Sequence, residues 1–177
     1  GWGWLVSNIC SCILSTGECS SPTPISSIPL SMVLWIPSLR RVSRNVNGLN
    51  DRIKRGAVFN HVKRMSVTVV FLQETQLMGT KCPFLHRYGF NKVYHAGYTK
   101  GSRGVTILIH RSLPMAILWA MLDTQGRYVA LEWMWEGTPY NLVSVYVPPH
   151  LLSPTLETLK DVIINLPQGT TVIGGRL

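Results

Sequence analysis

Apolar and polar residues follow recognisable periods from about residue 39 onward and not before it. The stretch "DRIKRGAVFNHVKRM" spaces five apolar residues at helical intervals, which predicts a helix with one apolar side. The continuous apolar run in "SVTVVFLQ" predicts a strand covered on both faces. The five helical positions are Ile53, Ala57, Val58, Val62 and Met65. These periods predict a folded domain at residues 38–177.

Residues 1–37 differ from this domain in composition. They are rich in Ser, Pro and Cys, and Glu18 is their single charged residue. No helical or strand period persists through them, so we interpret them as poorly ordered or foreign to the domain. The apolar stretch "GWGWLVSNICSCILS" lacks the basic flank of a signal peptide. The stretch between Pro29 and Pro37 falls well short of the ~20 residues of a membrane-spanning helix. We expect neither secretion nor a transmembrane segment.

The rest of the domain mixes strands with one further helix. Strands are predicted in "LRRVSRN", "GVTILIH", "YVALEWMW", "YNLVSVYV" and "TTVIGG", with "EGTP" as a hairpin turn between the third and fourth of these. The stretch between "SVTVVFLQ" and "GVTILIH", rich in Gly, Lys and Tyr, is predicted to be a loop. A helix is predicted in "SPTLETLKDVIINL", where Ser153 is a suitable cap and Pro154 suits the first turn. This order predicts a mixed α/β class, with helices packed outside a sandwich of sheets.

Charge narrows the possible partners. The chain carries 17 Lys and Arg against 8 Asp and Glu, a net charge of +9, which favours nucleic acid over a membrane surface. The chain is also more apolar than an average soluble domain, which leaves membrane contact or uncovered apolar surface as alternatives. Cys10, Cys12, Cys19 and Cys82 match neither a zinc-ligand spacing nor a disulfide framework. A reduced chain in the nucleus or cytoplasm is therefore expected.

Polar residues stand where several predicted strands end. Asn45 and Asn47 follow the first strand, Glu74 follows the second, and Tyr146 ends the strand "YNLVSVYV". Strand ends of an α/β fold converge on one rim, where such folds build their sites. Glu74 near two amides would suit Mg²⁺ that keeps several waters. Taken singly, a strand-end Glu is more often a solvated or capping residue, and a strand Tyr more often packs in the core.

Five segments, in this order and spacing, resemble the endonuclease/exonuclease/phosphatase superfamily. They are "SRNVNGLN", "VVFLQETQL", "GVTILI", "LVSVYVPP" and "TTVIGG", and the likeness covers about Leu39 to Gly175. It is strongest to the apurinic-type endonuclease domain of long-interspersed-element retrotransposons. The resemblance implies a four-layer α/β sandwich, two mixed sheets flanked by helices, incomplete here. It also implies Mg²⁺-dependent hydrolysis of a DNA phosphodiester without a small-molecule cofactor. In such elements the nick supplies the 3′-hydroxyl that primes reverse transcription, so the resemblance implies a reverse transcriptase domain in the full-length element.

The resemblance also assigns roles to single residues. Glu74 matches the metal-binding glutamate, and Asn45 matches the asparagine that organises metal and phosphate. Asn47 lies where repair relatives often have a second acidic residue, so we count it with the metal site. Tyr146 matches the tyrosine that contacts the scissile phosphate. Separately from the resemblance, the two basic residues Lys100 and Arg103 of the loop before "GVTILI" are predicted to reach the DNA backbone.

Departures from the family pattern concern the chemistry itself. Family members continue the last strand as Gly-Asp-Phe-Asn, whereas Arg176 occupies the Asp position here and the sequence stops at Leu177. The distal Asp and the Asp–His pair belong to a C-terminal half that this sequence lacks. Pro149 replaces a common Asn, and Arg44 replaces a Trp. We expect a C-terminally truncated chain without appreciable nuclease activity, in which the glycine pair of "TTVIGG" turns the backbone at the rim.

Two other functions remain open at this point. The chain could be a non-catalytic, basic nucleic-acid-binding remnant of such an enzyme. It could also belong to the phosphatase branch of the same superfamily, although "NVNGLN" with "QETQL" favours the DNA-cleaving branch.

Overall fold

The computed structural model describes residues 39–79, 82–99, 101–114, 116–135, 137–148 and 152–176, and describes only the backbone at Pro83, Arg87, Leu152, Ser153 and Arg176. The predicted segment 1–37, Lys100 and Pro149 therefore lie outside the described residues. The predicted boundary of the domain stays a prediction.

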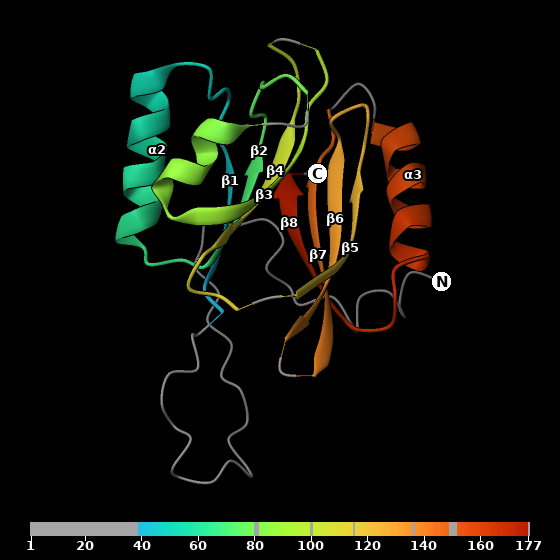
Figure 1. Cartoon of the computed structure of the whole chain (residues 1–177). Helices are drawn as coiled ribbons and strands as arrows, with labels where there is room; N and C mark the ends of the chain where they lie inside the picture. Colours follow the sequence, from blue (N-terminus) through green and yellow to red (C-terminus); the bar gives the residue numbers. More distant parts are fainter. Residues whose placement is uncertain are drawn as a thin grey trace, which may run out of the picture.

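Two four-stranded sheets face each other, and a helix covers the outer side of each (Figure 1). The first sheet has the order β1-β2-β4-β3, from β1 (Arg41–Asn45), β2 (Val69–Gln73), β3 (Phe90–Ala96) and β4 (Val105–His110). The second has the order β5-β6-β7-β8, from β5 (Ala116–Leu122), β6 (Tyr128–Trp135), β7 (Thr138–Tyr146) and β8 (Thr170–Arg176). The parallel pairs are β1–β2 and β7–β8. The predicted α/β sandwich with two mixed sheets is confirmed.

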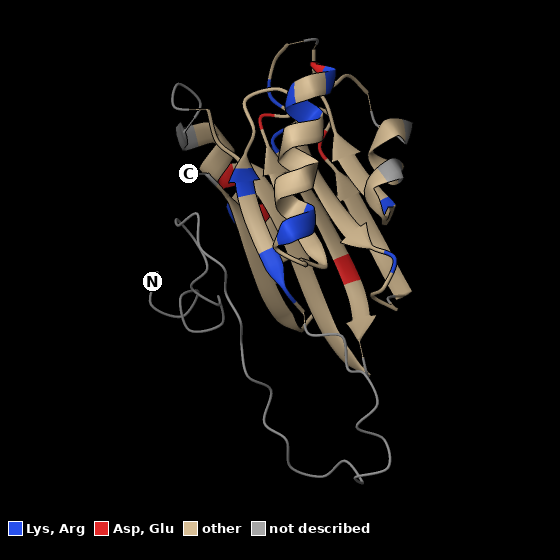
Figure 2. Ribbon diagram, turned by 90° about the vertical axis from the view of Figure 1, so that its left-hand side faces the viewer, with Lys and Arg blue, Asp and Glu red and all other residues tan. Residues whose placement is uncertain are grey.

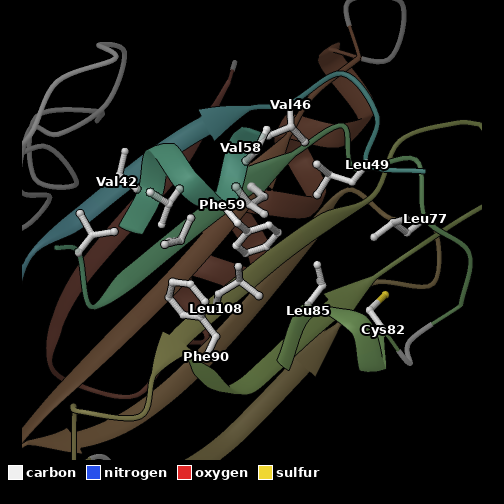
Figure 3. Packing of buried hydrophobic residues seen from close by; sticks show 14 residues of the cluster. Val42, Val46, Leu49, Val58, Phe59, Leu77, Cys82, Leu85, Phe90 and Leu108 are labelled. Atoms are coloured by element: carbon white, nitrogen blue, oxygen red, sulfur yellow. The ribbon is translucent and has the colours of Figure 1, made fainter. Parts of the chain in front are cut away.

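Helix α2 (Arg52–Arg64) covers the first sheet. Asp51 caps it, since its carboxylate accepts a hydrogen bond from the Lys54 backbone N–H at 2.7 Å. Phe59 is buried and stacks on Tyr88 with ring centroids 4.1 Å apart. Figure 3 shows Phe59 among the buried side chains between α2 and the sheet.

The predicted apolar side of this helix is wrong in its first turns. Val58 and Val62 are buried as predicted, but Ile53 is 83% exposed and Ala57 is exposed as well. The buried stripe of α2 runs instead through Val58, Phe59 and Val62. Ile53 and Ala57 lie more than a quarter of a turn away from every residue of that stripe, because about 3.6 residues complete one turn.

Helix α3 (Leu152–Ile164) covers the second sheet. It begins at Leu152, so Ser153 lies inside the first turn and not at the cap, as the sequence had suggested; Pro154 does lie in that turn. Leu159 is buried against the sheet, with Ile163 and Leu166 half-buried beside it. In the part of the chain that the structure describes, no helix is both long and apolar enough to cross a membrane.

Strands β3 and β5 were not predicted. Strand β3 lies in the stretch predicted to be a loop, together with the short 3₁₀ helix η2 (Pro83–Tyr88). Both strands are at sheet edges, and each carries an irregularity, between Phe90 and Lys92 and between Ile117 and Trp119. A bulge shifts the alternation of buried and exposed side chains, so neither segment keeps a two-residue period.

The glycine pair at the end of the chain lies inside β8 and does not form a turn. Gly174 pairs with Ser144 and Gly175 with Val145, and the strand continues through Arg176 opposite Tyr146. Neither glycine adopts a positive φ. A Cβ atom at Gly174 would lie 2.5 Å from Cγ of Phe71 in the facing sheet. The expected turn at the rim is therefore wrong, and Gly174 instead allows the two sheets to approach closely.

Candidate functional site

Buried polar side chains join the two sheets just below the rim on which β1, β2 and β7 end. The Gln73 amide donates to Ser43 Oγ at 3.2 Å, in the same sheet, and to Ser144 Oγ at 3.4 Å, in the facing sheet. Gln73 is 1% exposed. Since Glu74 follows Gln73 and Tyr146 lies two residues after Ser144, this contact sets the end of β2 opposite the end of β7.

Asn45 and Glu74 meet at this rim. Asn45 Nδ2 donates to Glu74 Oε1 at 2.7 Å, and Asn45 Oδ1 accepts from the Asn47 backbone N–H at 3.1 Å. The Asn47 side-chain oxygen accepts from Gln76 Nε2 at 3.2 Å. The structure thus brings together three of the residues singled out in the sequence, in one chain of hydrogen bonds that also includes Gln76.

Tyr146 reaches the rim from the facing sheet. Its half-buried side chain packs against the core between the sheets. Its backbone N–H donates to the Arg127 carbonyl at 2.7 Å. Arg176, the residue at the expected Asp position, is its neighbour on β8 in backbone register.

Left-handed backbone is concentrated in the loops of this rim. Asn47 (φ 44°), Glu74 (φ 53°), Gln76 (φ 57°) and Arg103 (φ 51°) adopt it although none is glycine. Each such residue costs about 1–3 kcal/mol and persists only where its surroundings enforce it. Here the enforcing contacts are backbone hydrogen bonds between the loops, among them Gly48 N–H to the Glu74 carbonyl at 2.6 Å and Gln76 N–H to the Arg103 carbonyl at 2.7 Å. Strain of this kind is typical of functional sites.

The first turn of α2 holds the loop that carries Asn45 and Asn47. Lys54 Nζ donates to the Asn47 carbonyl at 2.5 Å, and Arg55 donates to the Leu49 carbonyl at 2.8 Å. Figure 2 shows the basic residues at both ends of α2. No motif in the sequence marked Lys54, Arg55 or Gln76 as site residues, because they bond to loop carbonyls and a loop amide. The available signal was the run of basic residues soon after "NVNGLN".

A tight turn between β5 and β6 supports Tyr146 from the other side. The Asp123 carboxylate accepts from the Arg127 side chain at 2.8 and 3.0 Å and from the Arg127 backbone N–H at 2.9 Å. Burial alone would raise the pKa of Asp123, but the hydrogen bonds and charge of Arg127 outweigh it and hold that pKa below its ordinary value. The turn therefore keeps the carbonyl of Arg127 in place to accept from Tyr146.

The donor set at the rim is suited to one hard cation. Glu74 supplies a carboxylate and Asn47 an amide oxygen, both ligands that Mg²⁺ accepts while keeping waters. Among the described residues, no group of three or more His, Cys, Asp and Glu side chains comes together. Such a site would depend on Glu74 for its charge and bind Mg²⁺ weakly unless a phosphate joined it.

A buried histidine lies beneath the rim loops. His95 is fully buried, with Nδ1 2.7 Å from Thr106 Oγ1 and Nε2 3.3 Å from the Leu77 carbonyl. The contact with a carbonyl requires a proton on Nε2, so in the neutral ring Nδ1 accepts from the Thr106 hydroxyl. Burial lowers the pKa of His95, although backbone hydrogen bonds oppose this.

We expect the folded protein to lose stability as the pH falls below about 6.5, the ordinary pKa of histidine. The unfolded chain binds a proton at His95 there, whereas the folded chain does not, so acid favours unfolding until the lowered pKa is reached. Urea denaturation from about pH 7.5 to 5 measures the effect, which His95→Gln should reduce. His61→Gln, at an exposed position of α2, is the control, whereas His110→Gln should also reduce the effect because burial and Arg111 lower the pKa of His110. An unchanged pH slope in His95→Gln would contradict the prediction.

Comparison with solved structures shows that the chain shares its fold with proteins of known structure. The endonuclease domain of TRAS1, a telomere-specific non-LTR retrotransposon, matches with 16% identity and a TM-score of 0.53, over 75% of this chain and 55% of that one. An AP endonuclease from Archaeoglobus fulgidus matches with 20% identity and a TM-score of 0.55, over 74% and 54%. Humanized D. rerio TDP2 matches with 15% identity and a TM-score of 0.54, over 76% and 60%.

No protein-family model matches the sequence. The chain spans less than two thirds of the length of each of these three structures. Identities this low establish the shared architecture and not a shared activity. The resemblance seen in the sequence is confirmed at the level of the fold: the described residues share the architecture of these solved structures, among them a retrotransposon endonuclease domain and an AP endonuclease.

Proposed function

We propose that this chain is part of a Mg²⁺-dependent DNA phosphodiester endonuclease of the retrotransposon type, and that the 177-residue polypeptide binds DNA without cutting it. The single observation that carries the proposal is the hydrogen-bonded pair of Asn45 and Glu74 at the rim of this fold, with Arg176 on the neighbouring strand end. The proposal includes a reverse transcriptase domain in the full-length element and a nuclear or cytoplasmic location.

Each rim residue has a definite part in this function. Glu74 and Asn47 would hold the metal ion, which when bound neutralises charge that develops on the phosphate. Asn45 holds the Glu74 carboxylate in one orientation through its 2.7 Å hydrogen bond. Tyr146, on the facing sheet, would contact the phosphate through its phenol. The basic loop residues Arg103 and Lys100 supply contacts to the DNA backbone.

Arg176 is the reason to expect binding without cleavage. A guanidinium stays protonated at all ordinary pH values, so it cannot accept a proton from an attacking water. Loss of a general base alone costs about 10²- to 10⁴-fold in rate. The positive charge of Arg176 instead adds to the attraction for phosphate, in a chain whose net charge is +9.

The proposal is tested by binding and cleavage on the same DNA. We expect a duplex oligonucleotide to be retained in filter binding, with log affinity falling linearly against log salt by about 0.9 for each phosphate contact. We expect no nicking of supercoiled plasmid in Mg²⁺. Nicking that Glu74→Ala abolishes would overturn the loss of activity, and a chain that retains no DNA would overturn the proposed partner.

The proposed role of Glu74 as a metal ligand is tested by a separate measurement of metal binding. Glu74→Gln should weaken binding of Mn²⁺, used in place of Mg²⁺ as a paramagnetic probe, because it removes the carboxylate but keeps the shape of the side chain. Asp161→Asn is the matched control, since Asp161 is an exposed acid on α3 on the outer side of the second sheet. Equal Mn²⁺ affinity in wild type and Glu74→Gln would contradict the assignment.

A further inference from the structure

Two exposed apolar side chains lie side by side on the loops next to the candidate site. Met78 is 61% exposed and Tyr98 is 39% exposed. An isolated parallel bridge pairs the backbones of these two residues. Large exposed apolar groups that are adjacent to each other mark contact surfaces more often than single ones do.

Arg103 lies against this ring. Its guanidinium carbon is 4.8 Å from the centroid of the Tyr98 ring, within the range of a cation–π contact. A guanidinium N–H also donates to the Gln125 carbonyl at 3.3 Å. Neither the ring nor the carbonyl carries a charge that would neutralise the guanidinium. The pair therefore presents an aromatic plane and a planar cation together.

The backbone holds this pair in place. Arg103 adopts φ 51°, and its carbonyl accepts from the Gln76 N–H at 2.7 Å. Behind Tyr98, the turn at Gly126 packs so closely that an added Cβ would lie 3.2 Å from the Tyr98 nitrogen. A fixed platform loses little conformational entropy when a ligand stacks on it.

The position of the pair indicates its ligand. Gln76 bonds to Arg103 through its backbone and to Asn47 through its side chain, so one residue connects the platform to the Asn45–Glu74 pair. A planar group carried by a phosphate chain has both required parts: a π-face for the platform and an anion for the cation that Glu74 would hold at the rim. A nucleobase with its flanking phosphates is such a ligand.

We propose that Tyr98 and Arg103 stack an unpaired nucleobase of a DNA strand whose neighbouring phosphate lies at Asn45 and Glu74. The inference rests on the proposed DNA partner and adds to it the single-stranded character of the bound nucleotide and the residue, Tyr98, that recognises it. Paired bases are excluded from the platform, because their faces are already covered by their neighbours in the duplex.

The test compares two oligonucleotides with the same number of phosphates: a 20-mer of thymidine and a 20-mer of abasic sites. Fluorescence anisotropy gives the affinity of the 177-residue chain for each. Wild type should bind the thymidine strand about tenfold more tightly, since stacking of a single base on an aromatic side chain favours binding by about that factor. Tyr98→Ala should lose this preference while keeping its affinity for the abasic strand, and Tyr98→Phe should retain the preference.

Two more variants separate stacking from charge. Arg103→Lys keeps the positive charge without the planar group, so it should reduce the ratio of thymidine-strand to abasic-strand affinity. Lys63→Ala, at the far end of α2, should lower the affinity for both oligonucleotides by the same factor or leave both affinities unchanged. Thermal melting of each variant confirms that it is folded.

The outcomes distinguish this inference from the proposed function. A wild-type chain that binds both strands equally, or a folded Tyr98→Ala variant that keeps the full thymidine preference, overturns the stacking role and leaves DNA binding intact. A wild-type chain that binds neither strand overturns the DNA partner itself, and the stacking role with it.

Discussion

Replacing Gly174 by alanine is expected to lower the free energy of unfolding by about 1–3 kcal/mol, the usual cost of overpacking a core. The new Cβ would lie 2.5 Å from Cγ and 2.7 Å from Cβ of Phe71. Phe71 is 2% exposed and belongs to β2, which has β1 on one side and β4 on the other. It has no space into which to withdraw, so the two sheets must separate locally.

Urea denaturation of Gly174→Ala measures this cost. Gly56→Ala is the control, because nothing lies within 4 Å of an added Cβ there. Within α2 that change should stabilise the protein by up to about 1 kcal/mol, the difference in helix propensity. The double variant Gly174→Ala with Phe71→Leu should recover part of the loss. A Gly174→Ala protein as stable as wild type would show that the sheets do not meet as closely as described.

Replacing Asp123 by alanine is expected to cost about 3 kcal/mol of stability, at the lower end of the range for breaking a buried ion pair. The Asp123 side chain is 7% exposed and that of Arg127 is 19% exposed. Without its partner, the Arg127 guanidinium keeps its charge in surroundings that give it little water. The lower end applies because Arg127 retains some contact with solvent.

A double variant separates loss of the pair from loss of packing. Asp123→Ala with Arg127→Met should recover much of the stability, since it removes the unpaired charge and keeps an apolar stem. The single variant should also lose the acid sensitivity that Asp123 gives to wild type. The pKa of Asp123 is lower in the folded chain than its ordinary value of 3.8, so its contribution is present above that pH and is lost as the pH falls. If the double variant were as unstable as the single one, the charge of Arg127 would not be the cause.

Segments that are buried on both faces were predictable from the sequence. The run that became β2 has five buried residues in succession, and such runs have little alternative to a central strand. Strands β3 and β5 were not predictable, because an edge strand with a bulge keeps only part of its side chains in the core. The exposure of Ile53 also depends on where α2 meets the sheet, which no period in the sequence specifies.

The candidate site, like the fold, was predictable from the sequence only in part. Strand-end positions pointed to Asn45 and Glu74, and the structure brings these two within hydrogen-bonding distance across 29 residues of sequence. The contacts that hold them, through Gln76 and Lys54, involve loop carbonyls and amides that carry no signal of their own in the sequence. The purpose of the glycine pair was misjudged for a similar reason: the feature that requires Gly174 is a phenyl ring in another sheet.

The Gln73 amide has a consequence for how the sheets find their alignment. Facing sheets held by apolar side chains alone can slide past each other with little penalty, because such contacts are not directional. Gln73 is 1% exposed, and its hydrogen bond to Ser144 in the facing sheet forms in one alignment of the two sheets. Sliding by one residue would break this bond and leave one N–H of the buried amide without its partner, which costs about 1–3 kcal/mol. The buried amide thereby selects, during folding, the one alignment of the sheets in which Glu74, at the end of β2, and Tyr146, at the end of β7, lie at the same rim.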